Sequence, residues 1–561
     1  MLLGFVRFPY RRIYATIMTQ GERMFTLKIG TQEKSFEAPI QLKDLIDDPH
    51  HQYFLASVND RHYELFQTVD HAATIQFLDF TDEEASFTYE ASLMYLLAMA
   101  IERLYPDATF RFFFSVSKAV YVEFTSHPPL LTIKAILNDL KKMMQSLVDQ
   151  DLPIRRLTLS KADAIALLEP LKHPDKIEAI HLRPDGDVHV YACDGYYNYM
   201  YSHMVPSTGY LHTFDLKPYS PGFLLEMPRA DLGGMIPPFK DEPVFKEMLK
   251  EANRQALKHQ ALTVKSINQI SSGKALKTLI QNTENDHIKM LEDIGDHIHS
   301  RDEITLIAVT GPSSSGKTTF TQRLLKTLHE KGLKAQMISL DHYYKNRDDH
   351  VLVDGKPDLE HVEALDLKRL QKDMKSLIEG DEIKLPHYDF NVGKRTHETP
   401  LKLKAGEKIL MEGIHALNPR LLESIDEKNL LKIFISPHLQ LRLDEHNPFR
   451  LTSLRLLRRL VRDAATRGAS VEDTLNMWPS VRQGEFKWIY PFIEDADIVF
   501  NSALHYEMGV LKQKIEALLT PIERTHPHFI TVNRLLKYLK YFKPIDDTDV
   551  PKDSILREFI G

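Results

Sequence analysis

The segment TGPSSSGKTT at residues 310–319 decides the fold of the second half of this chain. It fits the pattern G-x-x-x-x-G-K-[ST], whose glycines let consecutive backbone N–H groups turn toward phosphate oxygens. The apolar run ITLIAV precedes this segment. The helical pattern TTFTQRLLKTLHEKG begins with the last two residues of the segment and continues beyond it. A strand, a phosphate-binding loop and a helix are therefore predicted in that order, with the positive end of the helix dipole at the phosphate.

Individual residues of this loop have separate expected roles. The Lys317 ammonium group suits the β- and γ-phosphates of a nucleotide, and the Thr318 hydroxyl suits Mg²⁺. The loop residues predicted to bind the nucleotide are Gly311, Ser313, Ser314, Ser315, Gly316, Lys317, Thr318 and Thr319. The loop alone does not distinguish a kinase from an ATPase or a GTPase.

From residue 303 onward, continuous apolar runs alternate with helical segments. The runs are ITLIAV, AQMISL, KILMEG, LLKIFIS and ADIVFN. Such runs are typical of parallel strands that helices cover on both faces. We therefore predict an α/β domain with a doubly wound parallel sheet at residues 303–515.

Two acidic residues stand at the carboxyl ends of predicted strands, the edge where α/β sheets bind ligands. Asp341 follows the run MISL, and Glu412 ends the run ILME. Asp341 could accept the proton of an acceptor hydroxyl, as phosphoryl transfer to an alcohol requires. Glu412 could hold Mg²⁺ through water or position Asp341. A single acid at a strand end can simply cap a helix, but two acids beside a phosphate loop favour catalysis.

The segment RLLRRLVRDAATRG at 455–468 is rich in arginine. Arg455, Arg458, Arg459 and Arg462 recur at helical spacing on one face, and Arg467 lies about one turn further. One interpretation is a solvated basic helix tied by ion pairs to Asp463. Because guanidinium groups suit phosphate oxygens and transition-state charge, we favour a lid that closes on the nucleotide.

These residues carry a resemblance to a known family. From about 303 to 505 the sequence resembles the uridine kinase and phosphoribulokinase family of P-loop kinases, through GPSSSGKTT, SLDHYYK, LEHVEALD, LPHYDF, MEGIHAL, LRRLVRDAATRG and YPFIEDADIVF. The resemblance implies an α/β P-loop kinase that uses ATP and Mg²⁺ to phosphorylate a sugar hydroxyl on a nucleoside or a pentose. GTP in place of ATP stays open.

The resemblance also implies roles for single residues. Asp341 matches the catalytic base, Lys317 and Thr318 match the phosphate and metal contacts, and Glu412 is a second candidate ligand of Mg²⁺. Arg459, Arg462 and Arg467 match the arginines of the lid, the first two as catalytic residues and the third as a nucleotide contact. The predicted acceptor contacts are Asp341, Tyr344, Glu360, Tyr388, Phe390, Arg395 and Glu412.

Departures from the family pattern concern the acceptor. Gly393 stands where uridine kinases have a histidine that contacts the base, and Glu360 replaces the aspartate that holds the ribose hydroxyls. Losing a base contact lowers discrimination, so uridine is only one candidate acceptor. A phosphorylated sugar is an alternative, with Lys394 and Arg395 as extra cations, although these two could equally form a solvated turn.

The first half of the chain resembles two domains of threonyl-tRNA synthetases, through YLLAMAIERLYPDA and VPSTGYLHTFDL. The resemblance implies a β-grasp (TGS) domain followed by an α+β editing-type domain. Ala91, Tyr95 and Met200 stand at or near metal-ligand positions, and His203 is displaced by one residue, so the metal site is predicted to be lost. The predicted segments are an unstructured extension at 1–23, the TGS-like domain at 24–83, the editing-like domain at 84–240, a helical connector at 241–302, and a C-terminal helix and docking tail at 516–561.

Composition limits the alternatives. The 561 residues carry a formal net charge of −7, which argues against binding of nucleic acid by the molecule as a whole. A tRNA-associated protein that uses ATP as a switch therefore remains the weaker hypothesis.

Cys193 is the single cysteine, so no internal disulfide can form and a reducing, cytoplasmic location is expected. A buried, inert thiol is favoured over a reactive one. No apolar run is long enough for a membrane span, so no membrane partner is expected.

Overall fold

In the computed structural model of this chain, five parallel strands form the sheet of the C-terminal half. In spatial order they are β16 (Ala335–Ser339), β21 (Lys408–Glu412), β15 (Leu306–Thr310), β22 (Leu430–Ser436) and β25 (Ile498–Asn501). Every neighbouring pair is parallel. The strands coincide with the five apolar runs, and the predicted α/β fold class of this half is confirmed.

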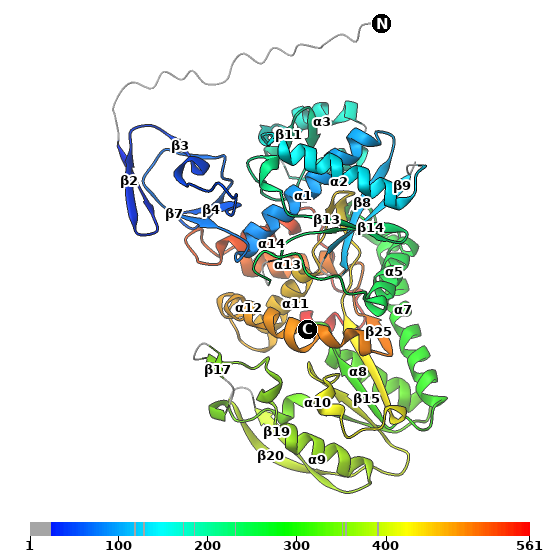
Figure 1. The fold of residues 1–561 in the computed structure, drawn as a ribbon. Coiled ribbons are helices and arrows are strands. Elements are labelled where there is room, and N and C mark those ends of the chain that lie inside the picture. Colours follow the sequence, from blue (N-terminus) through cyan, green and yellow to red (C-terminus); the bar gives the residue numbers. More distant parts are fainter. Residues whose placement is uncertain are drawn as a thin grey trace.

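The structure describes residues 24–116, 119–126, 130–171, 173–184, 186–229, 232–349, 352–353, 356–389 and 392–561. The predicted extension at 1–23 and the predicted acceptor contact Phe390 lie outside these residues. Figure 1 shows the N-terminal half above the C-terminal half, with the C-terminus between them. Within the described part of the chain, no helix combines the length and the apolarity that crossing a membrane requires.

Side chains of the central strand β15 alternate between two apolar cores, as the period of a strand dictates. Ala308 belongs to the core that contains α9 (Leu367–Ile378), whereas Val309 belongs to the core that contains α8 (Lys317–Glu330). Helices therefore cover both faces of the sheet, which explains why its strands read as continuous apolar runs.

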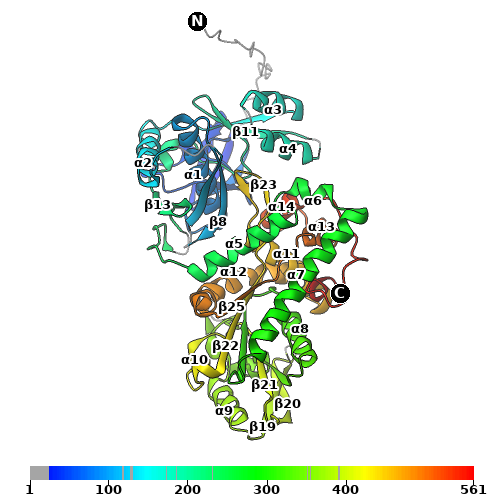
Figure 2. The ribbon, with the colours of Figure 1, turned by 90° about the vertical axis from the view of Figure 1, so that its right-hand side faces the viewer.

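The segment predicted as a helical connector is helical. It forms α5 (Pro243–Lys258), α6 (Val264–Gln269) and α7 (Gly273–His299), which cross the face turned to the viewer in Figure 2. Leu279 and Ile294 of α7 are buried in the same core as α8. The last connector helix is therefore also a structural layer of the C-terminal half.

The N-terminal half begins with a five-stranded sheet that packs on a long helix. The helix is α1 (Glu83–Leu104), which is apolar nearly all round and correspondingly buried on most sides. In the sheet β1 and β7 are parallel, and the other neighbours are antiparallel. The strands in order are β2 (Gln32–Phe36), β1 (Phe25–Ile29), β7 (Ala73–Leu78), β4 (Leu55–Val58) and β5 (Arg61–Tyr63).

Two further sheets complete this half. Buried side chains from Phe25 to Met227 form one continuous core, so the two predicted domains share α1 as a common support. The first sheet consists of β13 (Asp215–Tyr219), β14 (Gly222–Glu226), β9 (Ala119–Ser126) and β8 (Thr109–Val116), near α2 (Ile133–Asp149). The second consists of β10 (Arg155–Leu159), β11 (Val188–Cys193) and β12 (Tyr196–Asn198), near α3 (Lys161–Leu168) and α4 (Pro174–Leu182).

A short hairpin of the C-terminal half reaches into the N-terminal half. It consists of β23 (Arg442–Asp444) and β24 (Asn447–Pro448) and precedes α11 (Leu451–Thr466). Lys176 Nζ lies 3.3 Å from Asp444 Oδ1, and both side chains are buried. This ion pair and the backbone bonds around it join the two halves through polar groups as well as apolar packing.

Candidate functional site

The phosphate loop joins β15 to α8 and is curled by residues of positive φ. Ser314 has φ 61° and Gly316 has φ 86°, so the intervening N–H groups turn inward. A Cβ atom on Gly311 would lie 2.0 Å from the carbonyl oxygen of Ile435, so only glycine fits there. Lys317 Nζ donates to the carbonyl oxygen of Gly311 at 2.9 Å, which folds its ammonium group over the loop.

Two hydroxyl groups of the loop are available to hydrogen-bond a ligand. The hydroxyl oxygens of Ser314 and Ser315 are buried, and neither has a hydrogen-bond partner among the described residues. Buried hydroxyls normally find partners, so these two fit the oxygens of a bound phosphate. Thr318 is exposed at the first turn of α8, where its hydroxyl is free to face a cation.

Glu412 is the last residue of β21, and Asp341 lies in the short 3-10 helix directly after the neighbouring strand β16. Ser339 Oγ donates to Glu412 Oε1 at 2.7 Å and accepts from the Asp341 N–H at 3.4 Å, so one serine links the two acids. Burial, and then the negative charge of Asp341, raises the pKa of Glu412 to about 7. Burial also raises the pKa of Asp341, against the opposing charge of Lys317.

This acidic pair fits a divalent cation. Hard cations such as Mg²⁺ take oxygen ligands, typically one or two carboxylates together with phosphate oxygens of the nucleotide. Glu412 and the Thr318 hydroxyl supply such oxygens next to the phosphate loop. The charge of Asp341 raises the proton affinity of the buried Glu412, and a cation between the two carboxylates would relieve this repulsion.

The arginine helix α11 is buried instead of solvated, which overturns the solvated-helix interpretation. Arg458 is fully buried, and its Nε donates to Glu507 Oε2 at 2.6 Å. Arg455 Nη2 donates to Glu485 Oε2 at 2.7 Å. The guanidinium groups of Arg455 and Arg458 are therefore held by acids of the following helices, and these two arginines support the fold around the loop.

The remaining arginines are those that the family resemblance selected. Arg459 Nη1 donates to Ser313 Oγ at 2.9 Å, so its guanidinium group reaches the phosphate loop. Asp463 holds Arg459, Arg462 and Arg467, with nearest N–O distances of 3.1, 2.8 and 3.6 Å. The predicted ion pairs to Asp463 and the predicted approach of the arginines to the nucleotide site thus coexist.

Of the predicted acceptor contacts, Tyr344 lies near Asp341, Tyr388 lies near Tyr344, and Glu360 lies near Lys317 and Arg459 of the nucleotide site. Tyr344 Oη donates to the carbonyl oxygen of Leu359 at 3.0 Å, and its ring lies 5.8 Å from that of Tyr388. Burial, and then the charge of Glu485, raises the pKa of Glu360 to about 7. These aromatic rings and the Glu360 carboxyl group, between Asp341 and the nucleotide site, offer a surface for a sugar ring with its hydroxyl groups.

Arg395 is occupied by structural contacts. Its Nε and Nη2 each donate at 3.0 Å to the backbone carbonyls of Tyr344 and Tyr343, and its Nη1 donates to Asp366 Oδ2 at 3.1 Å. The guanidinium group therefore holds the segment that follows Asp341. The predicted direct contact of Arg395 with an acceptor gains no support from this geometry.

Sequence reasoning missed a row of histidines near the acceptor side. His387 and His397 face each other across the hairpin of β19 (Ile383–Asp389) and β20 (Lys394–Leu401), with ring centroids 4.3 Å apart. The His342 ring lies 4.8 Å from that of His387. Pairing the two strands around Gly393, which has φ 72°, would have placed His387 opposite His397.

Sequence reasoning also missed where the C-terminal tail docks. Glu558 Oε2 accepts hydrogen bonds from the N–H and the hydroxyl of Thr319, at 3.3 and 2.8 Å. A side-chain carbon of Ile555 lies 2.4 Å from the place that a Cβ on Gly316 would take. The docking predicted for the tail thus occurs directly on the phosphate loop.

In the N-terminal half, the four positions compared with metal ligands hold no metal-binding cluster. Ala91, Met200 and His203 line a cavity, and Tyr95 Oη donates toward the backbone carbonyl of Tyr196 at 3.2 Å. No group of three or more His, Cys, Asp or Glu side chains able to hold a metal occurs among the residues that the structure describes.

Comparisons with known proteins concern the C-terminal half. The profile of the Phosphoribulokinase / Uridine kinase family matches residues 306–507. The uridine kinase of Macrococcus caseolyticus (strain JCSC5402) is 30% identical over 221 residues, which cover 38% of this chain and 97% of that protein. The uridine kinase of Staphylococcus haemolyticus (strain JCSC1435) is 30% identical over 222 residues, 39% of this chain and 95% of that protein.

Solved structures of kinases also match part of the chain. A possible uridine kinase from Bacillus stearothermophilus shares 18% identity with a TM-score of 0.28, over 39% of this chain and 98% of that one. D-glycerate 3-kinase from Cryptococcus neoformans var. grubii shares 15% identity with a TM-score of 0.24, over 36% and 89%.

Proposed function

Through residues 306–507 this chain belongs to the phosphoribulokinase and uridine kinase family, and from this premise we propose that it transfers the γ-phosphate of ATP to a hydroxyl group of a nucleoside or a related pentose. The observation that carries the proposal is the meeting of Lys317, Asp341 and Glu412 at one edge of the sheet. A phosphate grip without an adjacent base would serve ATP binding alone. A carboxylate beside it supplies the proton acceptor that an alcohol needs.

In this proposal each side chain has a distinct task. Backbone N–H groups of the loop and Lys317 bind the β- and γ-phosphates, and Arg459 and Arg462 approach the transferring group from α11. Asp341 accepts the proton of the acceptor hydroxyl. Mg²⁺, held near Thr318 and Glu412, would neutralise phosphate charge when bound. Arg467 is the outermost arginine and would contact the nucleotide from the rim.

The acceptor would bind next to the Asp341 carboxyl group, with Tyr344, Tyr388 and Glu360 around it. The carboxyl group of Glu360 would bind sugar hydroxyls, and the two rings would pack against the sugar or the base. Because Gly393 offers no side chain to a base, we infer that several nucleosides or pentoses compete for the site, uridine among them. Since Arg395 is held by backbone carbonyls, a sugar phosphate is the weaker candidate.

For the N-terminal half we propose a synthetase-like scaffold without hydrolytic activity, built as a TGS-like part at 24–83 and an editing-like part at 84–240. The parallel pair β1 and β7 and the loss of ligand side chains at Ala91 and Tyr95 support this proposal. A cytoplasmic location is proposed on the single cysteine, Cys193.

Substitution of the proposed base tests the function. Asp341→Asn keeps the size of the side chain and removes the proton acceptor. We expect phosphoryl transfer from ATP to nucleosides and pentoses to fall about 10²–10⁴-fold, while the Kd for ATP changes little. Asp381→Asn, an exposed acid of the same half, is the matched control. Full transfer activity in Asp341→Asn would refute the proposal.

A further inference from the structure

A cavity of about 1190 Å³ lies between the two halves. Its walls come from α1, from residues 199–203, from the β23–β24 hairpin and from α14 (Phe529–Leu539). Neither the phosphate loop nor Asp341 lines it. The cavity is therefore a separate space from the nucleotide site, although the same C-terminal segment of the chain borders both.

The described lining is strongly basic. It contains twelve arginine and lysine side chains but only five glutamates and no aspartate. The chain as a whole has a formal net charge of −7, so this excess of positive charge is local. A concave basic surface in an acidic protein concentrates anions, because low-dielectric walls focus its field.

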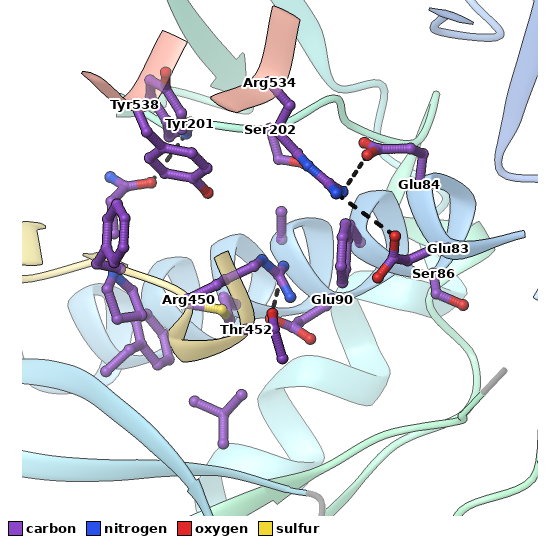
Figure 3. Close-up of a pocket in the computed structure, with 18 of the residues that line it drawn as sticks. Glu83, Glu84, Ser86, Glu90, Tyr201, Ser202, Arg450, Thr452, Arg534 and Tyr538 are labelled. Atoms are coloured by element: carbon purple, nitrogen blue, oxygen red, sulfur yellow. Dashed lines mark hydrogen bonds and ion pairs between the residues drawn. The ribbon is translucent and has the colours of Figure 1, made fainter. Parts of the chain in front are cut away.

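Most of the lining acids are already paired. Figure 3 shows Glu83 and Glu84 of α1 directed at Arg534, and Glu90 directed at Arg450. The closest oxygen of Glu90 lies 2.9 Å from Arg450 Nη2, and Arg534 forms ion pairs with both other acids. These pairs bind α1 to the C-terminal half and leave little negative charge for the other cations.

Three further lining cations form no ion pair with a carboxylate among the described residues: Arg183, Lys537 and Lys540. They are near enough to repel one another, since burial and the charges of Arg183 and Lys537 lower the pKa of Lys540 to about 8. Burial and the charges of Arg156 and Arg183 lower the pKa of His189, which also lines the cavity, to about 4. The carboxylates whose charge acts on Lys537 are Glu84 and Glu64, and they already pair with Arg534 and Arg156, so the cluster keeps an excess of positive charge.

Aromatic rings form the wall beside these cations. The ring of Tyr201 lies 4.9 Å from that of Tyr538 and 5.6 Å from that of Tyr541. The hydroxyl oxygen of Tyr201 is buried and has no hydrogen-bond partner in the described chain. The wall thus offers flat apolar surface and one unused polar group next to unneutralised positive charge.

We propose that this cavity binds a small phosphorylated metabolite that carries a planar ring. Its phosphate group would contact Arg183, Lys537 and Lys540, and its ring would pack near Tyr201 and Tyr538. The position of the cavity between the two halves and the net charge of −7 favour a small ligand over a polynucleotide, which needs an extended basic surface.

Calorimetric titration of the full-length chain tests this site. The Lys317→Ala variant serves as the background, because it weakens phosphate binding at the nucleotide loop. The probes are UMP, AMP and inorganic pyrophosphate. We expect saturable binding of at least one mononucleotide, weakened about tenfold or more when Lys537→Ala and Lys540→Ala are added together. Lys543→Ala, an exposed lysine outside the cavity, should change nothing.

Three results would overturn the proposal. One is the lack of saturable binding by any probe at millimolar concentration, and another is binding that the double substitution leaves unchanged. The third is salt-sensitive binding of tRNA that the double substitution abolishes, in a chain that binds none of the small phosphates. Circular dichroism and the unfolding midpoint of each variant ensure that lost binding does not reflect lost folding.

A second inference comes from the tail on the phosphate loop, and it rests on the proposed function. The N–H and hydroxyl of Thr319 at the start of α8 are donors that suit a nucleotide phosphate. In the structure they bind the carboxylate of Glu558. The tail is anchored by Phe559, which is buried beneath the guanidinium group of Arg458 at 4.9 Å from the ring centroid.

We infer that Glu558 competes with the nucleotide for the start of α8, so that the docked tail lowers the affinity for ATP. A carboxylate there repels phosphate oxygens and occupies two of their donors. Movement of the last residues, without unfolding of the sheet, would release the site.

The variant Glu558→Gln removes the charge and keeps the shape. We expect its Kd for MgATP to decrease by about tenfold relative to the natural chain, in the range of typical couplings between sites. Asp553→Asn, an exposed acid in the same tail, should leave the Kd unchanged. Equal Kd values in all three proteins would overturn the inference and spare the proposed function, whereas absence of ATP binding in all three would overturn the proposed function itself.

Discussion

The phosphate-loop edge and the cavity between the halves are both built for anions, but their residues are distributed differently along the chain. The loop spans residues 311–319, and the two acids lie at or just after the ends of the neighbouring strands β21 and β16. The cavity is lined by residues from Arg61 to Phe542. Local spacing specifies the first site, whereas tertiary packing assembles the second. The comparison teaches that motif chemistry can be read before the fold is known, and interface chemistry cannot.

Predictability from the sequence follows the same division. The five strands, the loop and the positions of Asp341 and Glu412 were predicted because each depends on neighbours a few residues away. The partners of Arg455 and Arg458 were not, because Glu485 and Glu507 lie 30 and 49 residues further along the chain. The charge pattern alone was compatible with two interpretations of that helix, a solvated basic helix and a lid over the nucleotide.

The C-terminal tail shows most clearly which contacts cannot be predicted from the sequence. Glu558 lies 239 residues from Thr319, and nothing in its local sequence points to a phosphate loop. In the N-terminal half the sequence indicated two parts through their resemblance to synthetase domains, but the single core that these parts share depends on α1 packing against distant sheets.

The largest effect is expected from a substitution in the phosphate loop, the site that local sequence specifies. Lys317→Ala removes the cation from the phosphate loop, and we expect transfer of phosphate from ATP to fall by about 10²–10³-fold at unchanged stability. Steady-state kinetics and the unfolding midpoint measure the two quantities. Lys326→Ala, an exposed lysine of the same helix, is the control. A loss of both activity and stability in Lys317→Ala would show that this lysine also supports the fold, and would contradict the distinction between the two regions.

The next effect concerns a contact that only tertiary packing creates. Arg458→Leu leaves the carboxylate of Glu507 buried without its partner, and both side chains are fully buried in the natural chain. We expect the free energy of unfolding to fall by about 3–5 kcal/mol in denaturant titrations. Adding Glu507→Leu should recover most of the loss. Equal instability of the single and double variants would contradict a paired role.

A smaller effect depends on pH. Glu360 has a pKa raised to about 7, against about 4.3 in an unfolded chain, so the natural protein loses stability as pH rises through this interval. Glu360→Gln lacks this loss. We expect it to exceed the natural chain in unfolding free energy by about 3 kcal/mol at pH 8 and about 1 kcal/mol at pH 5. An advantage that does not grow with pH would place the Glu360 carboxyl group in a more solvated site.

The smallest effect lies in the N-terminal half. Cys193 is buried, and burial raises the pKa of its thiol to about 11, which makes the inert reading the stronger one. We expect Cys193→Ala to lower the unfolding free energy by about 1 kcal/mol and to leave phosphate transfer within twofold. Maleimide labelling of the natural chain should require unfolding. Rapid labelling at neutral pH would indicate an open core in that half.

The most direct test of the central claim is a panel of acceptors assayed with γ-labelled ATP and Mg²⁺. Uridine, cytidine, other nucleosides, ribose and a pentose phosphate should be compared in one experiment, with labelled product separated from free phosphate. The account predicts labelled phosphate on a hydroxyl of at least one nucleoside or unphosphorylated pentose, with uridine displaced by competing acceptors. Release of free phosphate alone, at the same rate in Asp341→Asn, would contradict it.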